Sequence, residues 1–428
     1  MSLAKSIYLA GAKRRNPGLY GWYDFLKESE SWELQRLREY QLQELKRLLL
    51  MADKHSVFYK NYFRKHGFDP AVTSLEDLKQ LPPVSKTELI LKNDQIHTDL
   101  KFDKRFFCET SGSSGQVLTF WRDERWDSAN RAAILRGYSW HNVLPWESNI
   151  YFWGYNIEAG KQLRTRILDM FQNRYRIFDY SPKTLTRLLQ KLKSATYMHG
   201  YSSVIYELAK LVNEEEIELE MPLIKMIKGT SEKIYPHYQE EVQNAFGRRM
   251  ISEYGAAEAS IVAFECTAGN MHVTMENVLV EVEEDEVLIT NLVASSFPII
   301  RYKLGDYVKL SESRTCACGM EHPMIEEVRG RVGKNIHGYE HKYPSLTLYY
   351  VFKNLFFEQG LKFNYQCVQE NKGSLTVLIK EPFTSRGENL IRAEFGKYFR
   401  NDVAISIIFS QDFHSYTEKL KDFISRIE

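Results

Sequence analysis

Strand-like and helix-like segments alternate through much of the chain, and this alternation limits the fold more than any other feature of the sequence. Short apolar or β-branched runs are followed by segments whose apolar residues recur at helical spacing. This order is typical of parallel strands covered on both faces by helices, so we predict an α/β fold. The strand-like runs span 106–110, 117–121, 149–154, 175–180, 197–200, 223–229 and 249–254, and the helical runs span 126–140, 182–193, 204–214 and 238–246.

The segments on either side of this region have different patterns. An amphipathic helix is predicted from Trp32 to Met51, continuing toward Tyr62. After Ala259 the pattern changes to short strands with few helices between them, which predicts a β-rich subdomain at about 259–331. The remaining residues, 332–428, read as a separate α+β unit. A chain of 428 residues, 43% of them hydrophobic, is long enough for two or three domains.

Composition excludes several classes of protein. The 57 basic and 56 acidic residues give a net charge of +1, so no strong attraction to nucleic acid is expected. No apolar stretch approaches the roughly 20 residues that span a bilayer, and the apolar run at 7–10 is too short for a signal peptide. Five cysteines in a chain of this length do not make a disulfide framework. We therefore expect a cytoplasmic protein with reduced thiols.

Two short segments indicate a nucleotide site. Thr110-Ser-Gly-Ser-Ser-Gly115 is a hydroxyl- and glycine-rich loop behind an apolar run, and such loops present N–H and hydroxyl groups to anionic oxygens. Ser252-Glu-Tyr-Gly-Ala-Ala-Glu258 ends a strand-like run with an aromatic ring, a glycine turn and a carboxylate. Together they predict phosphates at the first segment and base and metal at the second.

Two further segments follow in order, Arg301-Tyr-Lys-Leu-Gly-Asp306 and Val328-Arg-Gly-Arg331. The four together resemble the adenylate-forming superfamily of acyl- and aryl-CoA synthetases, and within it the phenylacetate–CoA ligase branch, which includes relatives found with capsular-polysaccharide genes. The resemblance covers the chain from about Trp22 to the C-terminus. It implies a large N-terminal domain with parallel sheets at 1–331 and a small, mobile α+β lid domain at 332–428.

The resemblance also implies an activity. Such enzymes are ATP-dependent, AMP-forming carboxylate ligases, which make an acyl-adenylate and transfer the acyl group to CoA or another acceptor. Two alternatives stay open: an amide-forming adenylating enzyme of polysaccharide biosynthesis, and a catalytically silent nucleotide-binding assembly protein of the same fold. The branch has a glycine-rich apolar segment where this chain has polar residues at 154–161, with Arg164 and Arg166 behind them. These charges argue against phenylacetate itself.

Site residues follow from the resemblance motif by motif. Glu258 matches the carboxylate that coordinates Mg²⁺, a role that suits an oxygen ligand. Lys419 matches the catalytic lysine, with Lys421 as a nearby competitor, and the 332–334 segment falls at the hinge. The residues expected to bind the nucleotide are Thr110, Ser111, Gly112, Ser113, Ser114, Gly115, Ser231, Glu232, Tyr254, Gly255, Asp306 and Arg331.

The cysteines add an independent prediction. Cys316-Ala-Cys318-Gly resembles a segment of this branch, and Cys266 and His272 lie upstream in the same β-rich region. Three cysteines and one histidine can fill a closed tetrahedral zinc site. Structural Zn²⁺ is therefore expected, with His322 as an alternative nitrogen ligand and ordinary reduced thiols as the competing interpretation. The remaining histidines, His199 among them, have no partner evident from the sequence.

Overall fold

The computed structural model describes residues 3–110, 118–152, 159–177, 182–219, 221, 223–313, 315–331, 335–412 and 422–427. The chain divides into two compact units. Unit 1 comprises Met1–Leu304 and Val308–Glu327, and unit 2 comprises Gly305–Tyr307 and Val328–Glu428.

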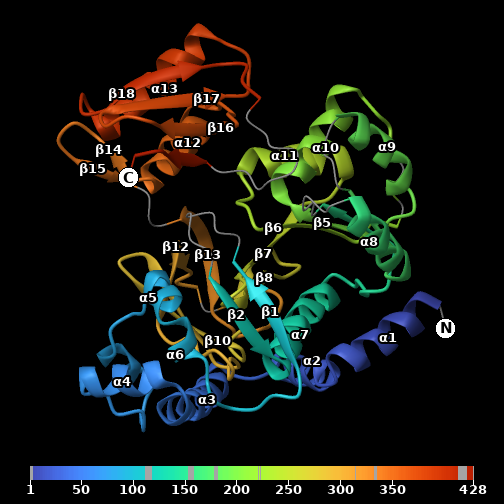
Figure 1. The fold of residues 1–428 in the computed structure, drawn as a ribbon. Helices are drawn as coiled ribbons and strands as arrows, with labels where there is room; N and C mark the ends of the chain where they lie inside the picture. Colours follow the sequence, from blue (N-terminus) through green and yellow to red (C-terminus); the bar gives the residue numbers. More distant parts are fainter. Residues whose placement is uncertain are drawn as a thin grey trace. The chain divides into compact units, whose positions relative to one another are not determined.

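The largest element is an 11-stranded sheet with the order β10-β11-β12-β13-β9-β8-β7-β6-β5-β3-β4. One half of this sheet, from β4 to β7, is parallel, as the alternating pattern predicts. Its strands are β3 (Asn149–Phe152), β4 (Arg174–Arg176), β5 (Tyr197–Tyr201), β6 (Met226–Thr230) and β7 (Met250–Ala256). The helices between and around them are α7 (Glu124–Trp140), α8 (Ala159–Phe171), α9 (Pro182–Leu192), α10 (Ser202–Glu214) and α11 (Pro236–Phe246) (Figure 1).

Side chains alternate between the two faces of the parallel strands, and both faces are covered. On one face Met198, Ile227 and Met250 belong to a buried core that includes residues of α9, α10 and α11. On the other face Tyr197 and Ile251 are buried in a cluster that includes residues of α7. Burial on both faces explains why these strands read as apolar runs in the sequence.

The β-rich region continues the same sheet and does not form a separate one. The chain reverses in a tight turn after β7, so that β8 pairs with β7 in the antiparallel sense. The expected short strands are present, and pairing across the turn joins them to the parallel half. They are β8 (Ser260–Glu265), β9 (Met271–Val273), β10 (Val278–Glu283), β11 (Glu286–Asn291), β12 (Tyr302–Leu310) and β13 (Met324–Arg331).

The N-terminal region is helical, with one departure from prediction. The helix expected from Trp32 toward Tyr62 is broken at Ser56, whose backbone is extended and whose hydroxyl accepts a hydrogen bond from the Tyr59 N–H at 3.4 Å. Such a serine cap starts a new helix, a local competition that apolar spacing does not reveal. The helices are α1 (Leu3–Arg15), α2 (Leu19–Ser29), α3 (Leu34–His55), α4 (Val57–His66), η1 (Glu76–Gln80), α5 (Lys86–Leu91) and α6 (Asn93–Ile96).

Unit 2 has an α+β arrangement. Its main sheet has the order β18-β17-β16-β19, and a small hairpin precedes it. Its elements are β14 (Asn335–His337), β15 (Lys342–Pro344), α12 (Leu346–Gln359), β16 (Tyr365–Gln369), β17 (Ser374–Ile379), α13 (Ser385–Phe399), β18 (Ala404–Ile408) and β19 (Phe423–Ser425). Across the described part of both units, no helix combines the length and hydropathy that crossing a membrane requires.

Candidate functional site

The serine- and glycine-rich segment connects the two strands of a hairpin, β1 (Arg105–Glu109) and β2 (Thr119–Asp123). Thr110 is buried at the start of the connection, and its N–H donates to the Leu118 carbonyl at 2.9 Å. The Thr110 hydroxyl accepts from the Leu118 N–H at 3.0 Å, which closes the base of the loop. Ser111, Gly112, Ser113, Ser114 and Gly115 lie outside the described residues, so their predicted role stays a prediction.

Glu258 lies in the tight turn between β7 and β8 and is 5% exposed. The Tyr302 hydroxyl donates a hydrogen bond to its Oε1 at 3.0 Å, and the Asn291 amide donates to its backbone carbonyl at 3.2 Å. The Arg122 guanidinium donates to the carbonyl of the preceding residue, Ala257. Donors from three other elements thus hold the turn and orient the carboxylate.

Tyr254 and Gly255 occupy the end of β7, immediately before this turn. Tyr254 is 8% exposed, and the pairing of β7 with β8 shifts register between the two residues. A side chain at Gly255 would place a Cβ 2.4 Å from the Ser260 carbonyl oxygen, so only glycine fits there. The irregularity places an aromatic ring and a carboxylate within four residues of each other at one end of the sheet.

The segment after β6 is held from the neighbouring helix. Ser231 has a positive φ of 67°, which bends the chain at the carboxyl end of the strand. The Glu232 carboxylate accepts a hydrogen bond at 2.9 Å from the Ser203 N–H, in the first turn of α10. The Glu232 side chain therefore caps helix α10. The prediction that this segment binds the nucleotide concerns its backbone.

Four predicted residues belong to other parts of the chain. Asp306 lies in β12 and Arg331 ends β13, both in stretches that cluster with unit 2. Lys419 and Lys421 fall outside the described residues, as does the predicted hinge at 332–334. The roles of these four residues therefore stay predictions.

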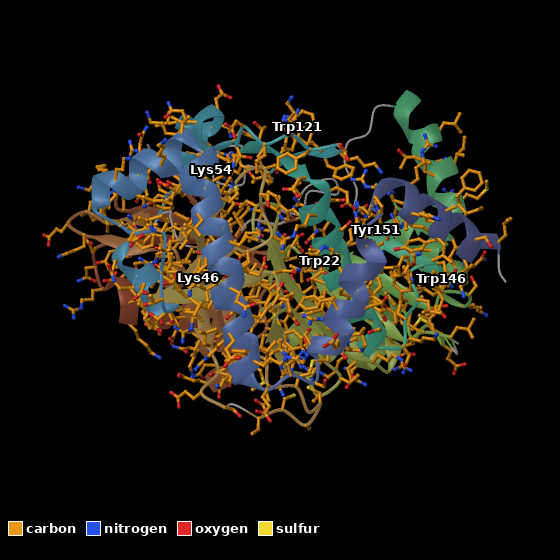
Figure 2. All side chains as sticks on the ribbon, turned by 90° about the horizontal axis from the view of Figure 1, so that it is seen from below. Trp22, Lys46, Lys54, Trp121, Trp146 and Tyr151 are labelled. Carbon is orange, nitrogen blue, oxygen red and sulfur yellow. The ribbon has the colours of Figure 1, made fainter. Side chains whose placement is uncertain are left out.

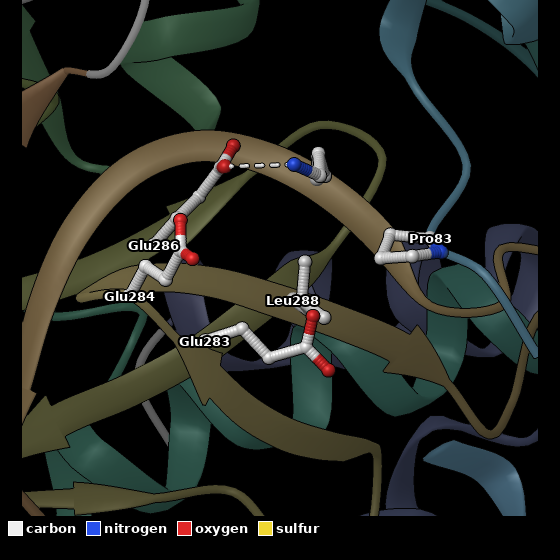
Figure 3. Close-up of a pocket in the computed structure, with 6 residues that line it drawn as sticks. Pro83, Glu283, Glu284, Glu286 and Leu288 are labelled. Atoms are coloured by element: carbon white, nitrogen blue, oxygen red, sulfur yellow. Dashed lines mark ion pairs between the residues drawn. The ribbon is translucent and has the colours of Figure 1, made fainter. Parts of the chain in front are cut away.

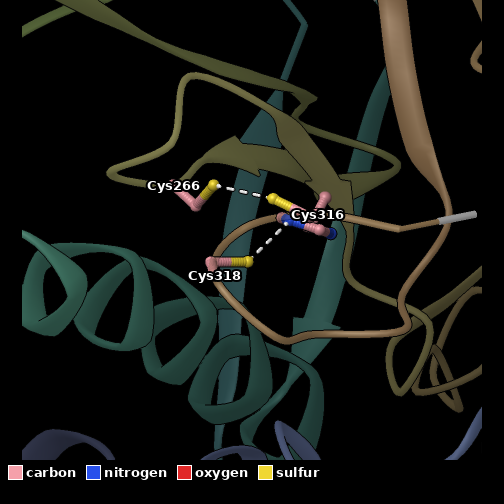
Figure 4. Close-up of side chains that lie close together, drawn as sticks. Cys266, Cys316 and Cys318 are labelled. Carbon is pink, nitrogen blue, oxygen red and sulfur yellow. Dashed lines mark hydrogen bonds between the residues drawn. The ribbon is translucent and has the colours of Figure 1, made fainter. Parts of the chain in front are cut away.

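The predicted metal ligands do converge. Cys266, His272, Cys316 and Cys318 each offer a ligand atom, and these atoms lie within 4.8 Å of one another. The Cys266 and Cys316 sulfurs are 3.7 Å apart, and the Cys318 sulfur is 3.2 Å from His272 Nε2 (Figure 4). Sulfurs bound about 2.3 Å from a tetrahedral zinc would stand about 3.8 Å apart, so the cluster has suitable dimensions.

Two glycine turns shape this cluster. The Gly269 N–H donates to the Cys266 carbonyl and the Gly319 N–H to the Cys316 carbonyl, each at 3.0 Å. Both glycines have positive φ, 81° and 86°, which tight turns of this kind require. The Cys-Ala-Cys-Gly pattern in the sequence is therefore a turn requirement as well as a ligand pattern.

The two histidine candidates have different positions. His272 Nδ1 lies 2.9 Å from the His322 carbonyl oxygen, an acceptor that leaves Nε2 directed toward the sulfurs. His322 instead places Nε2 2.9 Å from the Glu276 carboxylate and is 2% exposed. The geometry thus favours His272 over His322 as the nitrogen ligand.

A buried charge network lies behind the cluster, and the sequence did not reveal it. Glu276 is 0% exposed, and its carboxylate is 2.6 Å from the Arg136 guanidinium. Burial raises the pKa of Glu276, but Arg136 and His322 outweigh this and hold it below its ordinary value. Ser29 of α2 also donates to this carboxylate, so the network connects α2, α7 and the cluster.

A row of polar and aromatic side chains, buried at His199 and Lys228 and half-buried at the other two positions, crosses the parallel strands. Residues in register place Arg176, Tyr151, His199 and Lys228 side by side on β4, β3, β5 and β6. The Tyr151 and His199 rings stack at 4.5 Å, and Lys228 pairs with Glu253 at 2.6 Å. His199, which had no partner in the sequence, lies 3.3 Å from the Tyr138 hydroxyl through Nδ1. Only strand register reveals this row.

Burial and like charge set the state of His199. The side chain is 7% exposed, and burial lowers its pKa well below the usual value. The nearby cations Lys228, Arg174 and Arg176 act in the same direction. His199 is therefore neutral at physiological pH, and one of its ring nitrogens is a hydrogen-bond acceptor.

A pocket of about 550 Å³ lies elsewhere in unit 1. Three carboxylates, Glu283, Glu284 and Glu286, line it together with Lys303 (Figure 3). Lys303 is already paired with Glu286 at 3.2 Å. This excess of negative charge is unsuited to phosphates, so the pocket is not a candidate nucleotide site.

Comparison with known proteins gives the class of fold. No family model matches the sequence. Protein CapK of Staphylococcus aureus is 22% identical over 318 residues, covering 70% of each chain. The solved structure of 2-hydroxyisobutyryl-CoA ligase in the postadenylation state, with its acyl-AMP, has a TM-score of 0.72 at 16% identity, covering 94% of this chain and 92% of that one. The chain therefore has the fold of the adenylate-forming CoA ligases, which confirms the resemblance.

Two more structures extend this comparison. An open form of the same ligase with acyl-AMP and CoA has a TM-score of 0.62 at 16% identity, covering 92% of this chain and 93% of that one. An ATP-bound MatB chimera has a TM-score of 0.50 at 13% identity, covering 73% and 66% of the two chains. At these identities the likeness concerns the fold alone.

Proposed function

We propose that the protein is an ATP-dependent adenylating enzyme that joins a carboxylate to AMP and then transfers the acyl group. Similarity over 94% of the chain to a ligase holding an acyl-AMP supports this proposal. The observation that carries it is Glu258, a nearly buried carboxylate held in a turn by Tyr302, at the position where the family motif has its metal ligand.

The chemistry requires such a carboxylate. Adenylation brings two anions together and releases pyrophosphate, so the site must neutralise charge at the phosphates. An oxygen ligand at Glu258 suits Mg²⁺, which would supply positive charge to offset that of the phosphates. Tyr254 lies on β7, four residues before Glu258, and is the proposed platform for adenine. The segment at Ser231 would lie along the edge of the base.

The test of the first half-reaction needs no acceptor. ATP–pyrophosphate exchange should be measured with panels of aryl acids, amino acids and sugar uronates in the presence of Mg²⁺. Exchange dependent on one carboxylate class supports the proposal and identifies the substrate class. If ATP binds to the protein but no carboxylate supports exchange, the catalytically silent nucleotide-binding alternative is favoured.

The acceptor separates the remaining alternatives. CoA yields a thioester, and an amine or amino sugar yields an amide. Similarity to a ligase solved with CoA supports CoA as the acceptor and a thioester as the product. Similarity to CapK supports the alternative suggested by the capsule-associated relatives, in which an amine or amino sugar is the acceptor. Once a carboxylate is found, mass analysis of products made with CoA or with amines distinguishes the two.

Lys419 is the proposed catalytic lysine, acting in the first half-reaction. Its ammonium would offset charge between the carboxylate and the α-phosphate. Unit 2 would then rotate about 331–334 for transfer, with Gly333 allowing the backbone change. Lys419→Ala should suppress adenylation but spare transfer from synthetic acyl-adenylate. Equal loss in both steps, or a selective loss in Lys421→Ala alone, would contradict this assignment.

Zinc is the proposed occupant of the Cys266, His272, Cys316 and Cys318 cluster. The donor set is that of closed structural sites, and its distances match a tetrahedral ion. The Asn270 amide donates to the Cys316 sulfur at 3.2 Å, and the His322 carbonyl orients His272, as supporting groups do around bound metals. Zinc would fasten two loops and take no part in the reaction.

A further inference from the structure

The start of helix α7 contacts the turn that carries Glu258. Three side chains with hydrogen-bonding groups, spaced four residues apart, reach this turn from Arg122, Trp126 and Asn130. The Trp126 indole N–H donates to the Ser260 hydroxyl at 2.6 Å, and the Asn130 amide oxygen accepts from the Ile261 N–H at 3.0 Å. Residues four apart lie on one face of a helix, so one face of α7 follows the turn.

Arg122, just before α7, reaches the residue next to Glu258. Its guanidinium donates to the Ala257 carbonyl, and the residue is 9% exposed. The guanidinium carbon lies 5.3 Å from the centre of the Trp126 ring. The Ala257 carbonyl belongs to the peptide group that joins Ala257 to Glu258. The bond from Arg122 therefore fixes the backbone from which the Glu258 side chain departs.

Ser260 has a backbone conformation that is unusual for a residue with a side chain. Its φ is 69°, and it is 1% exposed. Such conformations are strained and persist where the surrounding structure holds them. The Ser260 hydroxyl accepts from Trp126 and from the Asn291 amide at 3.4 Å, and Asn291 also donates to the Glu258 carbonyl. Glycine would fit this backbone without strain but would lack the hydroxyl that joins these donors.

The start of α7 is itself fixed to the rest of unit 1. The Asp123 carboxylate caps the helix by accepting from the Trp126 N–H at 3.0 Å. It also accepts from the N–H groups of Ser295 and Ser296 at 3.1 and 2.9 Å. The carbonyl of Trp121, which Figure 2 labels, accepts from the Ser296 hydroxyl at 2.7 Å. The end of β2 and the first turn of α7 thus form a fixed support for the turn.

We propose that three positioning residues set the direction of the Glu258 carboxylate for metal binding: Arg122, Trp126 and Ser260. This inference rests on the proposed role of Glu258 as a ligand of Mg²⁺. A carboxylate that is free to turn would bind this ion more weakly, because Mg²⁺ needs near-ideal octahedral geometry. Arg122 and Trp126 bond to a carbonyl and a hydroxyl of the turn, so they would act through Glu258 and not on the metal directly.

Magnesium titration of ATP–pyrophosphate exchange tests the proposal. Arg122→Gln should raise the Mg²⁺ concentration for half-maximal exchange roughly tenfold, as the loss of groups that orient a metal ligand does. Arg122→Lys should recover part of this loss, because an ammonium can still donate to the Ala257 carbonyl. Ser260→Gly should shift the titration in the same direction yet fold normally, because glycine adopts the positive φ without strain.

The matched control is Arg125→Gln, in the same turn of α7. Arg125 donates to Glu44 of α3 at 2.7 Å and lies 5.4 Å from the ring of Trp22, which Figure 2 labels. Its contacts are thus with α2 and α3 and not with the Glu258 turn. Arg125→Gln should leave the Mg²⁺ titration unchanged, even if thermal melting shows a small loss of stability.

A second test separates positioning from general damage. In a Glu258→Gln background, Arg122→Gln and Ser260→Gly should cause no further loss of exchange, because residues that act through one group are not additive. A further tenfold loss in that background would overturn the proposal. So would a wild-type Mg²⁺ titration in both single variants, or an equal shift in Arg125→Gln.

ATP affinity, measured with and without Mg²⁺, distinguishes this failure from failure of the proposed function, since it needs no carboxylate. If Mg²⁺ strengthens ATP binding in wild type but not in Glu258→Gln, then Arg122→Gln and Ser260→Gly should weaken the Mg²⁺ effect. Wild-type behaviour of these two variants would refute the positioning role alone. A full Mg²⁺ effect in Glu258→Gln, or none in wild type, would refute the metal role on which it rests.

Discussion

The polar side chains at the two ends of strand β8 are arranged in different ways. The turn with Glu258 precedes the strand, and Cys266 follows it, so six residues, about 20 Å of extended chain, separate them. At the Cys266 end, side chains converge on one another and the groups behind them are paired within the protein. At the Glu258 end, neighbouring residues hold the turn and orient one carboxylate.

Under the proposed function, the Cys266 end is a metal site closed by its own residues and the Glu258 end is a site that receives a ligand. A structural metal site fills its coordination shell with protein atoms. In a reaction site, a few hydrogen bonds orient the carboxylate, and one of its oxygens stays available to bind a metal. The following experiments test whether the two ends differ in this way.

The largest effect is expected at the cluster. Cys316→Ser with Cys318→Ser should remove about one equivalent of zinc per chain. It should also cost roughly 5 kcal/mol or more of unfolding free energy, because zinc binding contributes directly to folding. Metal analysis and urea denaturation measure the two losses, with Cys108→Ser as the control. Unchanged zinc content in the double variant would refute the site.

The network behind the cluster should also be sensitive. Arg136→Met leaves Glu276 buried without its closest cation, so we expect a loss of about 3–5 kcal/mol in unfolding free energy. The exposed pair of Arg392 with Glu388 is the control, and Arg392→Met should cost roughly 0.5 kcal/mol or less. Denaturant titration of both variants gives the comparison, and equal losses would show that burial does not matter here.

At the other end of β8, stability and activity should separate. Glu258→Gln should lower pyrophosphate exchange roughly a hundredfold, about 3 kcal/mol at the transition state, because a metal-ligating oxygen is lost. Its unfolding free energy should change by less than about 0.5 kcal/mol. The control is Glu284→Gln in an exposed turn. Near-wild-type exchange in Glu258→Gln would exclude the metal assignment.

The smallest effect concerns His199 in the row across the parallel strands. Its pKa in the folded protein lies well below the usual 6.5, chiefly through burial. The unfolded chain therefore binds a proton that the folded chain excludes, and stability is lost as pH falls below about 6.5. His199→Gln removes this term, so the stability difference between wild type and variant should decline by about 1 kcal/mol from pH 7 to 5.5.

Urea denaturation at several pH values measures this dependence. A constant difference between wild type and His199→Gln would mean that the histidine takes up protons equally in the folded and unfolded states, which contradicts a pKa lowered by burial. Lys228 lies 5.2 Å from the Tyr138 ring independently of His199, so the variant should keep this contact and lose only the imidazole.

The sequence alone determined the class of fold and the order of the motifs. Alternating strand and helix patterns gave the parallel half of the sheet, because burial on both faces leaves continuous apolar runs. The Glu258 motif was recognisable because its glycine, aromatic and carboxylate are adjacent along the chain. The apolar spacing predicted one continuous helix where the structure has two, because the Ser56 side chain caps the start of a new helix.

Only the tertiary structure decided which distant residues meet. The pairing of β13 with β9 places Met324 opposite His272, and this brings the Cys316–Cys318 loop to Cys266. The choice of His272 over His322 and the burial of Glu276 follow from the same packing. The physical reason is that strand register and burial depend on contacts between residues far apart in the chain, which spacing along the sequence does not specify.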